Sequence, residues 1–310
     1  MSNLIGTTLQ GYRIEAELGR GGQAVVYRAT QESLQRTVAL KVVSAQLSGD
    51  PGFMERFKRE GISAASLDHP HIIPVYEAGE GEGLAFLAMK YVEGPSLDGV
   101  IRSDGALAVP RALALLRQVA EALDEIHRRD FLHRDVKPAN ILIGPGDHSY
   151  LSDFGLSKAV ADARLTGTGV WMGTFEYVSP EQISGGDVTA AADRYSFGAV
   201  VYETLTGQPP FQREDRSAML YAHLNDMPPA ASSVRPELGP GVDAVIERAM
   251  AKTADQRFPS NVAMIDALAA AVAGTPGAPS AAAPPAPTVA GPVALSLIHI
   301  SEPTRLESKS

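Results

Sequence analysis

The stretch His133-Arg134-Asp135-Val136-Lys137-Pro138-Ala139-Asn140 concentrates charged and metal-capable side chains in a short run. Apolar residues bracket it, Phe131-Leu132 before and Ile141-Leu142-Ile143 after, and the second group is typical of a short buried strand. Pro138 disfavours a regular helix and restricts the residue before it to an extended conformation. The pattern predicts a loop held against a core, presenting the side chains of Asp135, Lys137 and Asn140. Taken alone, the stretch also fits a polar turn between a helix and a strand.

Composition excludes several classes of protein. The chain has 310 residues and is 45% hydrophobic, enough for one large domain or two lobes with substantial cores. Its net charge of −9 disfavours a nucleic-acid-binding surface, although not a local basic site for phosphate. Because no cysteine occurs, disulfides, thiolate nucleophiles and cysteine metal sites are excluded. The first residues lack the pattern of a signal peptide, no run of about 18 apolar residues is present, and we expect the chain as written to be soluble.

A glycine-rich turn lies between two predicted strands near the N-terminus. Apolar and charged residues alternate over residues 12–18, Gly19-Arg20-Gly21-Gly22-Gln23-Ala24 follows, and residues 25–29 are β-rich again. A dinucleotide-binding glycine motif needs a helix after the glycines, so this arrangement disfavours that class. Glycine lets the backbone approach a phosphate closely because it has no Cβ.

Lys41 and Glu60 are predicted to lie on inward faces of neighbouring elements. Lys41 lies in the strand predicted over residues 38–43, on the face of Ala39 and Val43. From Pro51 the apolar spacing becomes helical, and Glu60 falls on or beside the apolar stripe. A buried carboxylate needs a partner, and Lys41 is the natural one. The alternatives are a lysine that protects a strand edge and a glutamate that stays solvated at the margin of the stripe.

Strands come first along the chain and helices afterwards, which indicates an α+β fold in two lobes. Two more strands are predicted over residues 72–78 and 84–89, and an extended connector over residues 90–94 forms the boundary. Helices are predicted over residues 111–128, 217–225, 241–251 and 260–272. We expect a first lobe with the connector over residues 1–92, a second lobe over 93–273, a disordered Ala/Pro-rich linker over 274–294 and a non-native tail over 295–310.

The pattern H-R-D-x-K-x-x-N resembles the catalytic loop of protein kinases. Asp153-Phe154-Gly155, after a predicted strand, resembles their metal-binding segment, and Ser179-Pro180-Glu181 resembles A-P-E with serine in place of alanine. The glycine turn resembles their phosphate-covering loop, with Ala24 where a third glycine is usual. Taken in order, these motifs resemble the eukaryotic-like serine/threonine protein kinases of bacteria, over about residues 12–272.

The resemblance implies transfer of the ATP γ-phosphate to protein Ser or Thr hydroxyls, with Mg²⁺, or alternatively Mn²⁺, as the metal. It implies that Asp135 orients the substrate hydroxyl or accepts its proton, that Lys137 steadies the γ-phosphoryl group, and that Lys41, held by Glu60, binds the α- and β-phosphates. Asn140 and Asp153 would ligate the metal. The residues implied in nucleotide binding are Gly19, Gly21, Val26, Ala39, Lys41, Met89 (the gatekeeper), Lys90 and Val92.

The resemblance also assigns regulatory and structural residues. Thr166 and Thr168 match autophosphorylated positions, and Arg134 with Lys158 would bind the added phosphate. The alternative is that both threonines stay unmodified. Structural roles fall to Asp193, which would brace the catalytic loop, and to Glu181 paired with Arg257; Tyr195 replaces a usual tryptophan, and Trp171 has no assigned role.

Two other functions remain as alternatives. A pseudokinase that acts as a scaffold is disfavoured because the catalytic set is complete, and a small-molecule phosphotransferase is disfavoured by the protein-substrate segment over residues 173–181. The expected partners are ATP, protein substrates and a second copy of the chain for trans-autophosphorylation, with no nucleic acid. We expect a cytoplasmic kinase domain. Related kinases often carry a transmembrane helix after such a linker, so membrane attachment of the natural protein stays open.

Overall fold

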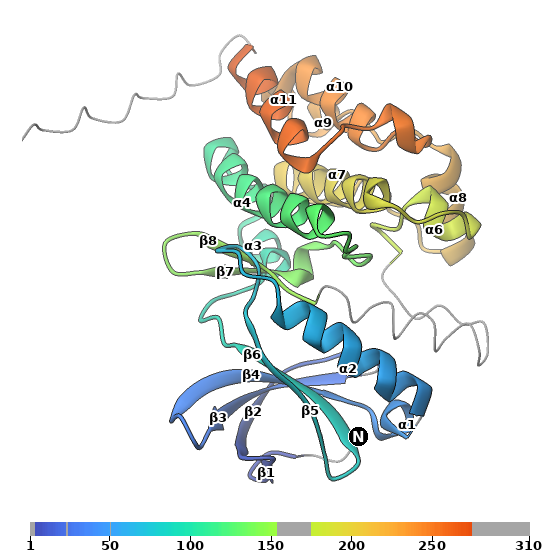
Figure 1. Ribbon diagram of the computed structural model, residues 1–310. Coiled ribbons are helices and arrows are strands. Elements are labelled where there is room, and N and C mark those ends of the chain that lie inside the picture. The colour runs from blue at the N-terminus through green and yellow to red at the C-terminus, as the bar shows by residue number, and fades with distance from the viewer. Residues whose placement is uncertain (1–3, 23, 50, 154–174, 275–310) are drawn as a thin grey trace, which may run out of the picture. The chain divides into compact units, whose positions relative to one another are not determined.

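An antiparallel sheet dominates the first part of the computed structural model, which describes residues 4–22, 24–49, 51–153 and 175–274. Neighbouring strands follow the order β1-β2-β3-β4-β6-β5 (Figure 1). Their bounds are Thr8–Leu9 (β1), Tyr12–Arg20 (β2), Ala24–Gln31 (β3), Arg36–Val43 (β4), Val75–Gly81 (β5) and Leu84–Lys90 (β6). Two helices, α1 (Ala45–Ser48) and α2 (Pro51–Ala65), connect β4 to β5.

The two faces of this sheet are buried in different apolar clusters. On β4, Val38, Leu40 and Val42 face a cluster that closes the sheet against β1 and β2. The alternate residues Ala39 and Val43 belong to the main core, together with Phe53 and Phe57 of α2. Because side chains of a strand alternate between faces, Lys41 shares the side of Ala39 and Val43. The strand therefore directs this lysine toward α2 and the helical part of the chain.

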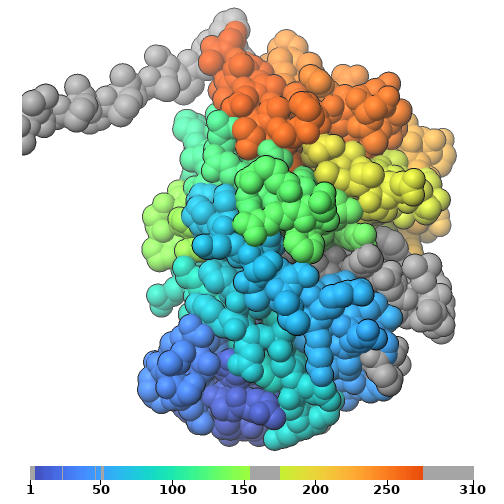
Figure 2. All heavy atoms as spheres, viewed as in Figure 1, coloured from blue at the N-terminus to red at the C-terminus, as the bar shows by residue number. Residues whose placement is uncertain are grey.

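Helices form most of the second part. Their bounds are Leu97–Asp104 (α3), Val109–Arg128 (α4), Pro180–Ser184 (α6), Ala190–Thr206 (α7), Arg216–Asn225 (α8), Ala231–Val234 (α9), Gly239–Ala249 (α10) and Asn261–Gly274 (α11). Short 3₁₀ turns occur at Pro138–Asn140 (η1), Pro236–Leu238 (η2) and Ala254–Gln256 (η3), and β7 (Ile141–Gly144) pairs with β8 (His148–Leu151). Figure 2 shows the outer sides of α4 and α11 next to each other on the viewed face.

Helix α7 lies at the centre of this second part. Every residue of α7 except Ala190 and Arg194 is buried, so the helix has no solvated face, unlike the amphipathic α4. Its ends are well defined, because the Thr189 side chain accepts a hydrogen bond from the backbone of Ala191 and Gly207 adopts a positive φ of 81° at the C-cap. Polar side chains on α7 are consequently held in fixed positions inside the protein.

The predicted α+β architecture, with a β-rich first lobe and a mostly helical second lobe, is confirmed. One boundary differs: the predicted strand over residues 72–78 begins only at Val75 in the structure. Pro74 cannot donate a ladder hydrogen bond, and Ile72 instead forms an isolated bridge with Leu151. Residues 275–310, with almost all of the predicted linker and the tail, lie outside the described residues. None of the described helices combines the length and apolar composition needed to cross a bilayer.

Replacing Gly61 by alanine should destabilise the fold. Helix α2 packs so closely on β5 that a Cβ at Gly61 would lie 2.4 Å from the Cβ of Ala78. We expect Gly61→Ala to lower the free energy of unfolding by about 1–3 kcal/mol, as overpacking usually does. The matched control is Gly99→Ala on α3, because the atom nearest to an added Cβ there lies 3.4 Å away. Urea denaturation should show little change for the control, and equal midpoints for the two variants would contradict the prediction.

Candidate active site

The loop over residues 133–140 is held in place by a buried carboxylate from α7. Asp193 is 1% exposed and accepts hydrogen bonds from the backbone N–H groups of His133 (2.8 Å) and Arg134 (2.7 Å). Its Oδ2 also lies 2.8 Å from Nε2 of His127 on α4. Burial alone would raise the pKa of Asp193, but the hydrogen bond and charge of His127, together with His133, keep it below the usual range. The ionised carboxylate can therefore hold Arg134 at a φ of 64°, a conformation that few non-glycine residues adopt.

The structure brings Asp135, Lys137 and Asn140 together. Nζ of Lys137 lies 2.8 Å from Oδ2 of Asp135. The side-chain amide of Asn140 donates to the backbone oxygen of Asp135 at 2.8 Å and to its Oδ2 at 3.1 Å. Lys137 is extended, with φ −159° and ψ 160°, and Pro138 starts the short turn η1 that carries Asn140 back toward Asp135. The Asp135 side chain remains 40% exposed, so its carboxylate can reach a bound molecule.

His133 connects this loop to the end of β8. Its side chain is fully buried, and its Nε2 lies 2.9 Å from the backbone oxygen of Ser152, next to Asp153. The backbone N–H and the hydroxyl of Ser152 both donate to the backbone oxygen of Asn140, at 2.9 and 3.0 Å. Asp153 is thereby fixed relative to the loop that contains Asp135. His133 had no separate role predicted from sequence, because the sequence around a buried loop histidine does not indicate its partner.

Lys41 forms an ion pair with Asp153. The distance from Nζ to Oδ1 is 2.7 Å, and Asp153 adopts a φ of 64°. Burial would raise the pKa of Asp153, but the charge and hydrogen bond of Lys41, helped by His133 and Lys137, keep it below the usual range. We expected Lys41 to pair with Glu60; among the described residues its ion-pair partner is Asp153, while Glu60 lies half-buried on α2. The carboxylate that reaches the ammonium thus comes from the segment after β8 rather than from α2.

The strand register lines up several of the residues implied in nucleotide binding. Gly19 of β2 pairs with Val26 of β3, which pairs with Lys41 of β4. Packing does not explain Gly19, because a Cβ there would meet no atom of the described structure within 4 Å. Between the strands, the Gly21 N–H donates to the backbone oxygen of Ala24 at 2.9 Å, which closes the turn. This arrangement fits a backbone that approaches a phosphate.

The predicted connector begins at the end of β6. Met89 pairs with Ala39 of β4, and both side chains are buried. The Lys90 side chain donates to the hydroxyl of Tyr150 on β8 at 2.6 Å. The backbone N–H of Lys90 donates to the backbone oxygen of Pro74 at 2.9 Å. These contacts anchor the chain at Lys90, and Val92, two residues on, is buried at 9% exposure. Residues 89–92 therefore form a firmly anchored link between the two lobes.

Asn140 and Asp153 supply oxygen ligands of the kind that Mg²⁺ prefers. Because the Asn140 amide nitrogen donates to Asp135, its Oδ1 is left without a donor among the described residues. Asp153 is kept ionised. The described residues contain no group of three or more His, Cys, Asp or Glu arranged to hold a metal. Two protein ligands fit a cation that also coordinates substrate phosphates.

Comparison with known proteins agrees with this geometry. The model of the protein kinase domain matches residues 12–264. The chain belongs to the protein kinase family. Similar curated kinases are the serine/threonine-protein kinases PknH of Mycobacterium bovis, 42% identical over 83% of this chain and 43% of that protein, and PknE of the same species, 43% identical over 82% of this chain and 44% of that protein. These matches confirm the resemblance to eukaryotic-like serine/threonine kinases of bacteria.

Solved kinase structures show the same fold. The kinase domain of Mycobacterium tuberculosis PknI has a TM-score of 0.72 with 32% sequence identity, over 88% of this chain and 100% of that one. The present kinase chain spans less than half the length of the curated relatives that it matches.

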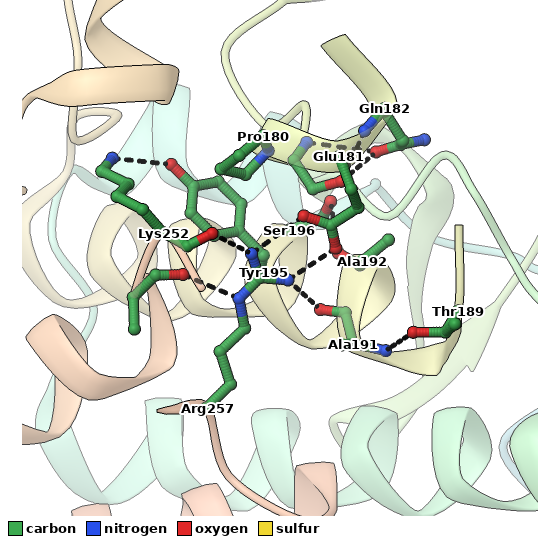
Figure 3. Close-up of polar contacts among 12 residues, drawn as sticks. Pro180, Glu181, Gln182, Thr189, Ala191, Ala192, Tyr195, Ser196, Lys252 and Arg257 are labelled. Atoms are coloured by element: carbon green, nitrogen blue, oxygen red, sulfur yellow. Dashed lines mark hydrogen bonds and ion pairs between the residues drawn. The ribbon is translucent and has the colours of Figure 1, made fainter. Parts of the chain in front are cut away.

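A buried ion pair joins two distant parts of the kinase domain (Figure 3). Arg257 donates through Nη1 and Nη2 to the carboxylate of Glu181 on α6, at 2.6 and 2.9 Å. The same guanidinium donates to the backbone oxygens of Ala191 (2.7 Å), Ala251 (2.8 Å) and Lys252 (3.3 Å). The Arg257 side chain has no exposed surface. Glu181 and Arg257, which the resemblance paired in a structural role, thus meet, and they fix α6 against the start of α7.

Tyr177 and Glu203 form a contact that the sequence analysis missed. The Tyr177 hydroxyl donates to Oε2 of Glu203 on α7 at 2.5 Å. Burial, helped by the charge of Glu203, raises the pKa of Tyr177, so the hydroxyl keeps its proton. Two residues on, α6 starts with a capping box between Ser179 and Gln182, and Gln182 donates to the backbone oxygen of Arg134 at 3.0 Å. The segment that follows residue 175 is therefore tied both to α7 and to the catalytic loop.

Four predicted residues lie outside the described residues: Lys158, Thr166, Thr168 and Trp171. Arg134 is described and lies half-buried next to Asp135. Its assignment to phosphate binding stays a prediction.

Removing one partner of the Glu181–Arg257 pair should strongly destabilise the kinase domain. Arg257→Met leaves the largely buried Glu181 carboxylate without its partner and removes one hydrogen bond from each of three backbone oxygens, so we expect a loss of about 3–5 kcal/mol in the free energy of unfolding. The control is Arg102→Met, because the Arg102 side chain is 79% exposed in its pair with Asp98. Urea denaturation measures both, and a loss for Arg257→Met as small as for the control would refute the prediction.

Asp193→Asn should reduce phosphoryl transfer by about ten- to hundredfold, because one charge-assisted hydrogen bond is worth about 1.5–3 kcal/mol. The matched control is Asp124→Asn. Asp124 also accepts backbone N–H groups, from Asn261 and Val262 at 2.9 and 3.0 Å, but does not touch the catalytic loop. Both variants should lose stability, whereas only Asp193→Asn should lose kcat when assayed well below its melting temperature. Equal kcat values for the two folded variants would contradict the bracing role.

Proposed function

We propose that this protein is a serine/threonine protein kinase that transfers the γ-phosphate of ATP to Ser or Thr hydroxyls of proteins. One observation carries the proposal. A single loop collects Asp135, Lys137 and Asn140 within hydrogen-bonding distance, and His133 links that loop to Asp153, which pairs with Lys41. A catalytic carboxylate, two ammonium groups and two oxygen ligands for a cation meet the needs of phosphoryl transfer, which depends on positioning and charge neutralisation.

Each residue has a role in this proposal. Asp135 orients the substrate hydroxyl and accepts its proton, since its carboxylate is partly exposed and held by Lys137 and Asn140. Lys137, already beside Asp135, donates to the γ-phosphoryl group. Lys41 binds the α- and β-phosphates. To do so, its ammonium group leaves Asp153 and contacts phosphate oxygens, and Glu60 becomes its carboxylate partner.

Asn140 and Asp153 hold the metal ion. A cation held by these two residues, Mg²⁺ in this proposal, would supply positive charge that offsets the negative charge developing during transfer. The oxygen-only ligand pair suits Mg²⁺, with Mn²⁺ as an alternative. The backbone of the glycine turn covers the phosphates, and the buried side chains of Ala39 and Met89 lie against the base.

Regulation forms part of the proposal. Phosphorylation of Thr166 or Thr168 would add about −1.5 to −2 charge at neutral pH. Arg134 and Lys158 would bind that phosphate, as the resemblance implies. In this proposal, one copy of the chain phosphorylates Thr166 or Thr168 of a second copy. The cytoplasm supplies the ATP that the reaction needs.

An autophosphorylation assay tests this function. Intact-mass analysis of the full chain after incubation with Mg-ATP should show added phosphates, with peptide mapping at Thr166 and Thr168. Asp135→Asn should lower the rate by about 10²–10⁴-fold, the usual contribution of a general base, and Lys41→Met should abolish detectable transfer.

The controls are Asp130→Asn and Lys58→Met, which change exposed residues of the same types. Unmodified parent protein that still binds nucleotide, and that leaves myelin basic protein unmodified, would instead support a pseudokinase scaffold.

A further inference from the structure

Lys252 places a positive charge inside the helical lobe without a carboxylate partner. It follows α10 and is half-buried, and no carboxylate of the described residues forms an ion pair with it. Its Nζ donates to the backbone oxygens of His223 (2.9 Å) and Ala222 (3.4 Å) and to the hydroxyl of Tyr195 (3.3 Å). All three acceptors are neutral, so the hydrogen bonds of the ammonium group go to dipoles and not to a carboxylate.

Two of these acceptors belong to the last turn of α8. The last carbonyl groups of a helix lack intrahelical donors and carry partial negative charge. The Ala222 oxygen also accepts the backbone N–H of Asp226 at 2.9 Å, and Lys252 donates more closely to the His223 oxygen, at 2.9 Å. The basic residue of that turn is His223, but burial, helped by the charge of Lys252, lowers its pKa to about 4. His223 is therefore neutral, and the cation that stabilises this end of α8 comes from Lys252, outside the helix.

Aromatic rings surround the ammonium group on its other sides. Nζ lies 5.1 Å from the ring centre of Phe211 and 5.5 Å from that of Tyr195, within the range of cation–π attraction. The Tyr195 hydroxyl also lies 3.0 Å from Nδ1 of His223. Figure 3 shows Lys252 reaching Tyr195 with its side chain while its backbone oxygen accepts from Arg257. Lys252 thus connects α7 and α8 to the buried Arg257 network.

Helix α8 borders the segment that precedes α6. The guanidinium of Arg216, at the start of α8, lies 4.3 Å from the ring centre of Phe175. Met219 of α8 and Phe211 line a depression of about 460 Å³ together with Glu176. The position of α8 therefore shapes the surface beside residues 175–177, the protein-substrate segment of the proposed kinase.

We propose that Lys252 is a positioning residue that holds the C-terminal end of α8 and thereby sets the affinity for the protein substrate. The inference rests on the proposed kinase function and adds to it a residue that touches neither ATP nor the reacting atoms. Loss of the cation would let α8 shift against Phe175 and Glu176. Binding of the protein substrate would weaken, whereas binding of ATP, which involves the sheet, would not change.

The positive charge of Lys252 lowers the free energy of unfolding. Burial lowers the pKa of Lys252 to about 8, with Asp226 opposing the shift and Arg257 adding to it. Because this pKa is below the ordinary value of 10.5, the folded state releases the proton first. The cost is therefore present below pH 8 and disappears as the pH rises from about 8 toward 10.5. Removing the charge of Lys252 should therefore not lower the free energy of unfolding through electrostatics. A positioning role predicts a change in substrate affinity without such a loss of stability, whereas a purely structural role predicts the loss.

Steady-state kinetics of Lys252→Met with myelin basic protein and ATP tests the inference. At pH 7 we expect KM for the protein substrate to rise about fivefold, because cation–π and helix-dipole terms of this kind are each worth about 0.5–1 kcal/mol. KM for ATP and kcat should stay within about twofold of the parent values. Arg248→Met is the matched control, since it removes a cation 4.3 Å from the Phe258 ring without touching α8. Its kinetic constants should equal those of the parent.

A pH profile of the parent gives a second readout. KM for myelin basic protein should rise between about pH 7 and pH 9 as Lys252 loses its proton, and Lys252→Arg, which stays charged over that range, should flatten the rise. Neither neighbour interferes, because the pKa of His223 is lowered to about 4 and burial raises that of Tyr195.

Equal KM values for the parent and Lys252→Met would overturn the inference, as would equal increases in KM for both substrates. If Lys252→Met does not fold, a flat pH profile of the parent between about pH 7 and pH 9 would overturn it. A parent protein that phosphorylates neither itself nor myelin basic protein would overturn the proposed function itself. That result is obtained without any variant of Lys252.

Discussion

The carboxylate of Asp193 is the contact on which the site depends. It lies in the interior at the first turn of α7, where an ionised group is stable only if its oxygens are fully hydrogen-bonded. The backbone N–H groups of His133 and Arg134 and the ring of His127 satisfy it. In return, the carboxylate holds the catalytic loop in a conformation that the loop would not keep in isolation. The ionisation of Asp193 and the conformation of the loop over residues 133–140 therefore depend on each other.

Local sequence predicted the elements better than it predicted their contacts. Alternating residues identified β2, an apolar β-rich run identified β4, and helical spacing identified α2 and α4, because each pattern depends on the chain within about a dozen residues. The start of β5 was placed too early since apolar residues on both sides of Pro74 hid its missing N–H donor. The composition of residues 133–140 and the motifs around it were enough to predict which residues would meet in the loop.

Contacts between distant residues could not be predicted in the same way. The partner of Lys41 depends on where α2 and the segment after β8 lie relative to β4, and no local pattern contains that information. The position of Glu60 on the helical stripe and the resemblance both suggested Glu60, whereas the described structure has Asp153. His133, Gln182 and Tyr177 were missed for a related reason: a buried polar residue acquires its meaning from the donor or acceptor that the fold brings to it. Lys252 is a further example, since its acceptors are backbone oxygens of another helix.

The length of α7 sets the distance between two anchor points in the kinase. Asp193 at one end of the helix holds the catalytic loop, and Glu203, ten residues later, holds Tyr177. An α-helix advances 1.5 Å per residue, so the two anchor points are about 15 Å apart along a rigid rod. Inserting or deleting a single residue between them would rotate one anchor by about 100° relative to the other, since each turn has 3.6 residues. The interval between the two carboxylates of α7 therefore has to keep its length.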